Sequence, residues 1–197
     1  MTVDLSADMM VFFHERMAAA LSRKRLRLAD ATEFYLVNLL TGFARLPAEH
    51  SIGEPFVERM ADALAAPTDQ ERYRRFRDLG DHALYVCGFF SEHLAHRGVS
   101  RNYVVAMGGR AYVAAAELAG RASGSGLARV YPELAAHFDP LAHVLDEVRE
   151  TTSLRTPQDI IRLYERWRAT GSALLAERLE REGVFPQVTP PRGRLLH

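Results

Sequence analysis

Two segments of this chain are apolar on nearly every side, whereas several flanking segments carry a single apolar stripe. The first runs over residues 82–90 and the second over residues 103–112, with a short polar break between them. A helix that is apolar all round belongs in the centre of a bundle, because a surface helix needs only one apolar stripe. The pattern therefore predicts two central antiparallel helices, over residues 81–97 and 101–121.

The flanking segments repeat apolar residues at every third or fourth position, which is typical of amphipathic helices. A helix is predicted to begin at Asp30, and it places Asn38 among leucines, where we expect a buried side chain. The last helix is predicted to run unbroken from Pro157 to Glu182, since proline suits the first turn of a helix. Gly80 interrupts the apolar pattern, and the sequence leaves open whether a helix kinks or breaks there.

No segment alternates apolar and polar residues with the period of a strand, and no repeat of roughly 20 to 50 residues recurs along the chain. The sequence therefore predicts an all-α fold, a single-domain helical bundle of about seven to nine helices. We expect residues 1–183 to form the bundle and residues 184–197 to form an extended tail. A chain of 197 residues is long enough to bury one core without disulfides.

Composition and charge argue against nucleic acid and acidic membranes as binding partners. Lys and Arg together number 25, as do Asp and Glu, so no overall field draws the chain to nucleic acid or to an acidic membrane. Two basic clusters, over residues 23–27 and 72–77, are interpreted as solvated helix surfaces. Neither a signal peptide nor a membrane span is expected. The single cysteine, Cys87, sits among apolar residues, which predicts a buried thiol in a reducing cytoplasm.

Carboxylate and histidine residues raise the question of a metal site. Four acid and histidine pairs have the i, i+4 spacing that places both side chains on one helix face. These pairs are Asp78/His82, Glu92/His96, Glu133/His137 and Asp139/His143. The Glu-x-x-His motif of di-iron bundles does not occur, and neither does a nucleophile elbow or a phosphate loop. We therefore predict neither a metal nor a cofactor.

Several polar residues interrupt the apolar helices, and each needs a partner if it is buried. They are predicted to form a buried polar cluster that either stabilises the bundle or binds a ligand. Arg110 is the cation of this group, and a structural ion pair with Glu33, Asp81, Glu92 or Glu165 is favoured over ligand binding. The predicted cluster comprises Glu33, Asn38, Asp81, Tyr85, Arg110 and Tyr112.

The predicted C-terminal helix is long enough, at ~1.5 Å per residue, to overhang a domain of this size. Apolar residues on an overhanging end need cover from a second chain, or from the tail folding back. Both outcomes stay open, and we predict an interface there with a homodimer partner or another protein. The predicted interface residues are Trp167, Leu174, Leu175 and Leu179.

Several strings together resemble an uncharacterised bacterial family of all-helical cytoplasmic proteins with no assigned function. The resemblance spans most of the chain, from about Asp30 to Gly183, and implies a bacterial cytoplasmic protein without indicating any catalytic residue. The strings are Thr32–Leu40, Leu79–Asp81, Tyr85–Phe90, Met107–Tyr112 and Leu163–Trp167.

No nucleophile, base and oxyanion donor occur together in a recognisable pattern. The sequence therefore favours a non-enzymatic helical interaction or regulatory protein that binds a protein partner. The alternative is a helical-bundle enzyme or sensor that holds a small ligand or metal in its core.

Overall fold

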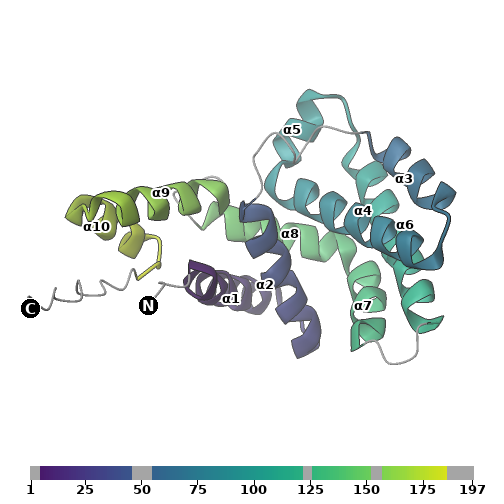
Figure 1. The fold of residues 1–197 in the computed structure, drawn as a ribbon, viewed down its shortest axis with the longest axis horizontal. Helices are drawn as coiled ribbons and strands as arrows, with labels where there is room; N and C mark the ends of the chain where they lie inside the picture. The colour runs from purple at the N-terminus through teal and green to yellow at the C-terminus, as the bar shows by residue number, and fades with distance from the viewer. Residues whose placement is uncertain (1–4, 46–54, 122–125, 152–156, 186–197) are drawn as a thin grey trace, which may run out of the picture.

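The computed structural model describes residues 5–45, 55–121, 126–151 and 157–185. Helices are the only regular elements over these ranges, which confirms the predicted all-α bundle (Figure 1). Within the same ranges, no helix has both the length and the apolar character to cross a membrane. The elements are α1 Leu5–Lys24, α2 Asp30–Arg45, α3 Phe56–Ala65, α4 Asp69–Phe89, α5 Ser91–His96, α6 Arg101–Arg121, the short 3-10 helix η2 Gly126–Arg129, α7 Val130–Ala136, α8 Phe138–Glu150, α9 Pro157–Thr170 and α10 Ala173–Arg181.

Helices α4 and α6 form the most extensive helix contact in the described residues, and α8 packs against the other side of α4 (Figure 1). The predicted central pair is therefore confirmed, although the limits of its first helix were wrong. Helix α4 begins at Asp69, where the Thr68 hydroxyl accepts a hydrogen bond from the Glu71 amide at 3.1 Å. It ends at Phe89 rather than at residue 97, and the short helix α5 follows.

Glycines set the distance between the central helices. The chain stays helical through Gly80, and the ring of Tyr112 packs directly on the backbone at this position. A Cβ atom at Gly80 would lie 2.7 Å from two carbon atoms of that ring. Gly108 meets Phe138 in the same way, and Gly88 meets Leu145. Glycine here permits close helix packing rather than a break.

The C-terminal region differs from the single helix predicted over residues 157–182. Helix α9 ends at Thr170, and Gly171 then adopts a left-handed conformation with φ +62° before α10 begins. Helix α10 packs on α9, so the two form a helical hairpin at one end of the long axis (Figure 1). The prediction failed because Gly171 stands between two helical patterns that share one apolar period.

Helix α10 itself ends in a Schellman motif, which folds the start of the tail back. Gly183 has φ +81°, and its amide donates to the Glu180 carbonyl at 2.9 Å. The Val184 amide donates to the Leu179 carbonyl, also at 2.9 Å, and both of these side chains are buried. The predicted extended tail therefore starts with a packed residue at Val184, and its residues from 186 onward lie outside the described ranges.

Candidate functional site

Two tyrosines from different helices donate hydrogen bonds to one carboxylate oxygen in the middle of the bundle. Tyr35 of α2 donates to Asp81 Oδ1 at 2.7 Å, and Tyr112 of α6 donates to the same oxygen at 2.8 Å. Asp81 follows Gly80 on α4, so the close approach of α6 at Gly80 brings the Tyr112 hydroxyl within reach of this carboxylate. The carboxylate therefore links three helices through one atom.

Further tyrosines hold these two donors in place. The fully buried ring of Tyr131 on α7 lies edge-on to Tyr35, with centroids 5.7 Å apart, and stacks on Tyr112 at 6.1 Å. The hydroxyl groups of Tyr131 and Tyr73 are 2.7 Å apart and share a hydrogen bond. Packed aromatic rings have few rotamers open to them, so the positions of both donors to Asp81 are fixed by the core.

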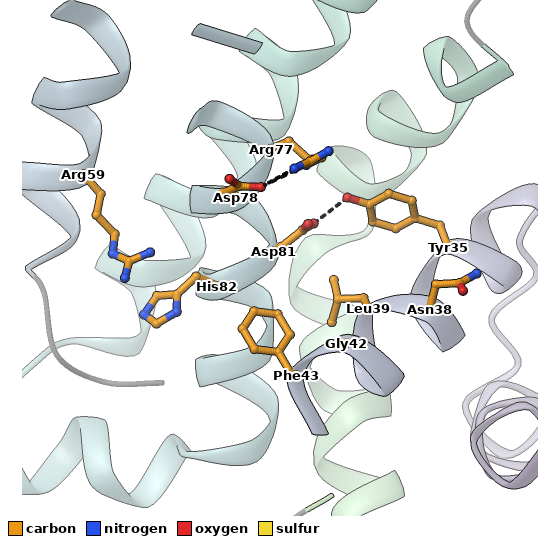
Figure 2. A pocket seen from close by; sticks show the side chains of 10 residues that line it. All are labelled: Tyr35, Asn38, Leu39, Gly42, Phe43, Arg59, Arg77, Asp78, Asp81 and His82. Atoms are coloured by element: carbon orange, nitrogen blue, oxygen red, sulfur yellow. Dashed lines mark hydrogen bonds and ion pairs between the residues drawn. The ribbon is translucent and has the colours of Figure 1, made fainter. Parts of the chain in front are cut away.

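Asp81 borders a cleft of about 580 Å³ between α2, α3 and α4 (Figure 2). The volume falls in the range of small-molecule sites, and apolar atoms dominate its surface. The charged side chains that line the cleft belong to α3 and α4, whereas those from α2 are aromatic, amide and aliphatic. The lining residues are Tyr35, Asn38, Leu39, Gly42, Phe43, Arg59, Arg77, Asp78, Asp81 and His82.

The protonation of Asp81 is shifted toward neutral pH. Burial is the largest cause and raises the pKa of this carboxyl to about 7, while the hydrogen bonds from Tyr35 and Tyr112 and the charge of Arg77 oppose the rise. The pKa of the Tyr35 hydroxyl is raised above its usual value by burial and by the nearby Asp81, as is that of Tyr112. Both tyrosines therefore stay protonated and act as donors.

His82 is shifted in the opposite direction. Its side chain is 4% exposed, and burial together with the positive charge of Arg59 lowers the pKa of the imidazole to about 4. The ring lies 5.4 Å from Phe56 and 6.4 Å from Phe43, measured between centroids. The cleft is thus bordered by a neutral imidazole at neutral pH.

The other two charged residues that α4 places at the cleft form an ion pair with each other. Arg77 donates to Asp78 Oδ1 from Nε at 2.9 Å and from Nη2 at 2.7 Å (Figure 2). Both bonds reach the same carboxylate oxygen, and each is a charge-assisted hydrogen bond. The Asp78 carboxylate is consequently occupied by Arg77, although the sequence suggested it as a partner of His82.

The structure brings together only part of the predicted polar cluster. Asp81 and Tyr112 are in direct contact. Tyr85 is fully buried one turn after Asp81, and its ring stacks on Phe43 with centroids 4.2 Å apart. Of the predicted cluster, these three residues lie at or beside the cleft as buried or half-buried groups.

The other three predicted residues point elsewhere. Arg110 is exposed, because it precedes Tyr112 by two positions and such residues lie on nearly opposite faces of a helix. Glu33 precedes Tyr35 by two positions, so it lies on nearly the opposite face of α2 from the side chain that contacts Asp81. Asn38 borders the cleft but is exposed, and its amide donates to the Phe34 carbonyl at 2.8 Å. The prediction that Asn38 is buried was therefore wrong.

Tyr35 is the functional residue that sequence reasoning missed. A signal was present, since Tyr35, Asn38, Leu39 and Gly42 have the i, i+3, i+4, i+7 spacing of one helix face. These four residues do line the cleft together. Without a known neighbour, that face could not be distinguished from an ordinary apolar stripe.

Within the described residues, no group of three or more potential metal ligands comes together. Two of the candidate acids are engaged in other contacts. Glu133 accepts hydrogen bonds from the Ala29 amide, at 3.1 and 3.2 Å, and from the Thr32 hydroxyl at the start of α2. Asp139 forms an ion pair with Arg101, and its Oδ2 also lies 3.9 Å from His143 Nε2, so this predicted pair does come together on one helix face. The side chain of Glu92 lies outside the described residues.

Cys87 is buried, as predicted, with 1% of its surface exposed. Burial raises the pKa of its thiol to about 12. A thiolate is the reactive form of cysteine, so this residue is a core side chain rather than a nucleophile.

The predicted interface residues divide into buried and exposed members. Leu179 is fully buried and Trp167 is 7% exposed, so both are covered by this chain itself. Leu175 is half-buried, whereas Leu174 is 74% exposed on the outer side of α10. Helix α10 packs on α9, and α9 also packs on α2.

Comparisons with family models, with curated proteins and with solved structures found no match. This result is consistent with the resemblance to a family without an assigned function, and a bacterial origin stays a prediction. The site's geometry therefore provides the argument for function.

Proposed function

We propose that this protein binds a small organic molecule in the cleft between α2, α3 and α4, with Asp81 as the central polar contact. The proposal corresponds to the sensor alternative that the sequence left open. A protein of this kind would transmit the bound state through its helices without chemical turnover. A cytoplasmic location stays a prediction, supported by the buried free thiol of Cys87.

The observation that carries the proposal is the unequal use of the two Asp81 oxygens. Oδ1 accepts both tyrosine hydrogen bonds, and among the described residues no hydrogen bond is made to Oδ2. Oδ2 is not one of the fully buried polar atoms that lack a hydrogen bond in the described residues, so it is accessible from the cleft and needs a partner from solvent or from a ligand. A ligand in the cleft can supply that partner.

The cleft also has the composition of a ligand site. It combines aliphatic and aromatic walls with a few polar groups, which is the usual pattern for small organic ligands. Gly42 adds room on the α2 side, since a Cβ atom there would have no neighbour within 4 Å. Titratable groups with shifted pKa values, Asp81 and His82, converge on the same space.

A thermal-shift screen of small organic compounds against the purified chain tests the proposal, with calorimetry on each hit. Ligand binding to the folded state raises the melting temperature, by an amount that grows with the logarithm of the ratio of ligand concentration to Kd. We expect hits whose affinity falls at least about tenfold in Asp81→Asn, which keeps both tyrosine hydrogen bonds but loses the charge. Glu117→Gln removes an exposed acid from α6 and should retain full affinity. Compounds that bind Asp81→Asn with the same affinity as the wild type would contradict the proposal.

A second candidate function is contact with a protein partner or a second copy through α10. Leu174 is 74% exposed and Phe185, just after α10, is 70% exposed. Light scattering on the full chain and on Leu174→Glu tests this. Concentration-dependent association that disappears in Leu174→Glu supports it, and a monomer throughout the micromolar range removes the self-association form.

A further inference from the structure

We infer that the cleft selects a cation, an organic ammonium ion whose N–H group donates to Asp81 Oδ2 while its apolar body lies against Leu39 and Phe43. The inference rests on the proposed binding function and names the ligand class of that site. The preference for a cation depends on which hydrogen-bonding groups of the cleft already have partners within the protein.

The donors nearest to Asp81 are already used. Tyr35 and Tyr112 both direct their hydroxyl hydrogens at Oδ1, so neither is available to an acceptor on a ligand. Arg77 is held in two hydrogen bonds by Asp78. Those two bonds hold the guanidinium at Asp78, and the group that Asp81 itself offers to a ligand is the acceptor Oδ2, whose natural complement is a charged N–H donor.

Arg59 does not reverse this preference. It extends from α3, and Figure 2 shows its guanidinium next to the His82 imidazole and away from the Asp81 carboxylate. The charges bordering the cleft sum to zero when Asp81 is ionised, since Arg59 and Arg77 balance Asp78 and Asp81. Selectivity is therefore local, and the ammonium group belongs at the Asp81 end.

The aromatic lining favours the same class. Tyr35 and Phe43 both border the cleft, and Phe43 is fixed in a parallel stack on Tyr85 with an interplanar angle of 6°. Aromatic rings attract cations through their negative faces, by ~0.5 to 2 kcal/mol depending on solvation. An anion placed beside the same rings and the Asp81 carboxylate would be repelled.

Ligand binding should release a proton. The groups facing Asp81 are Tyr35 from α2, Arg59 from α3, the α4 residues Arg77, Asp78 and His82, Tyr112 from α6 and Tyr131 from α7. Burial places the pKa of Asp81 at about 7. A bound cation holds Asp81 ionised, so the complex loses the proton that the free protein carries.

Three probes that share a phenyl ring and a two-carbon linker separate the ligand classes. They are 2-phenylethylammonium, 2-phenylethanol and 3-phenylpropanoate, titrated up to about 10 mM by calorimetry. We expect the ammonium ion to bind at least about tenfold more tightly than either of the others. Titrations in buffers of different ionisation enthalpy should give about 0.9 proton released per ligand at pH 6 and about 0.1 at pH 8.

Asp81→Asn and Glu117→Gln complete the experiment. Asp81→Asn should lose the preference for the ammonium ion and the proton release together, while Glu117→Gln keeps both. Tighter binding of the alcohol or the carboxylate, with dependence on Asp81, would overturn the cation inference and leave the binding function standing. If none of the three probes binds, the cation inference fails. If the compound screen also gives no hit that depends on Asp81, the binding function fails with it.

Discussion

Asp81 and His82 are neighbours on α4, and their pKa values are shifted in opposite directions. The pKa of the carboxyl is raised, and the pKa of the imidazole is lowered. Burial raises the pKa of Asp81 from 3.8 to about 7 and lowers that of His82 from 6.5 to about 4. Between these limits the folded protein carries a protonated carboxyl and a neutral imidazole. The unfolded chain instead carries a carboxylate and an imidazolium, so both states hold one proton on this pair.

The first prediction follows from that equality. Stability changes with pH only where folded and unfolded states bind different numbers of protons. The contribution of this pair to the free energy of unfolding should therefore be nearly independent of pH between about 4.5 and 6. This window lies between the two shifted pKa values. Urea unfolding at several pH values measures this.

Single substitutions should expose the two opposing contributions. In Asp81→Asn only His82 remains, whose lowered pKa makes stability rise with pH, by up to about 2 kcal/mol from pH 4.5 to 6. In His82→Gln only Asp81 remains, whose raised pKa makes stability fall with pH over the same range, by a similar amount. Equal slopes in the wild type and both variants would show that the shifts are absent.

The second prediction concerns the hydrogen bond from Tyr35. This bond lowers the pKa of Asp81, so Tyr35→Phe should raise that pKa further. Carbon-13 NMR titration of the Asp81 carboxyl measures the change. Tyr103→Phe, which alters a partly exposed tyrosine on α6, is the matched control and should leave the midpoint where it is. A lower midpoint in Tyr35→Phe would contradict the assigned contact.

The third prediction compares two glycines in central helices. Gly80→Ala should destabilise the protein by about 1 to 3 kcal/mol, because the new Cβ would lie 2.7 Å from the Tyr112 ring. Gly109→Ala, where a Cβ would meet nothing within 4 Å, should stabilise by about 0.5 to 1 kcal/mol through helix propensity. Urea unfolding of both variants decides. A stabilised Gly80→Ala would mean that the helices separate there at little cost.

The fourth prediction compares two leucines on α10. Leu179 is fully buried and Leu174 is 74% exposed, so Leu179→Ala should cost about 2 to 5 kcal/mol and Leu174→Ala less than about 0.5 kcal/mol. Thermal unfolding at low protein concentration measures both. A large loss in Leu174→Ala under those conditions would indicate that α10 is covered by something other than α9.

The sequence predicted the central helices because residues 82–89 are apolar on every side, and the structure buries all of them. It also identified Asp81 and Tyr112, since a charge or hydroxyl in such a segment needs a partner. It could not orient Arg110 and Tyr112, whose opposite directions depend on which face of α6 meets α4. Spacing along one helix gives relative directions only, and the neighbouring helix decides which direction is inside.

The cleft could not be predicted for the same reason, because it forms between helices whose arrangement the sequence pattern does not give. Tyr35 and Asp81 are 46 residues apart in the chain, and no local pattern relates them. Gly171 was misread for a different reason, because helical periodicity continued on both sides of it. A glycine with positive φ is the usual end of a helix, and that local rule carried more information than the apolar period.

The contact of Arg16 with the end of α10 has a consequence for how the chain opens. Arg16 Nη2 donates to the Glu182 carbonyl at 2.8 Å, which joins residues 166 positions apart, and Nη1 reaches the Thr151 carbonyl at 3.4 Å. Apart from α9 itself, α10 has no extensive helix neighbour in the described residues. Because α9 also packs on α2, we expect α10 alone to open as a local unit when the Arg16 contact is broken. Its amide hydrogens should exchange with solvent through that partial opening, well before those of α4 and α6, whose exchange requires the whole core to unfold.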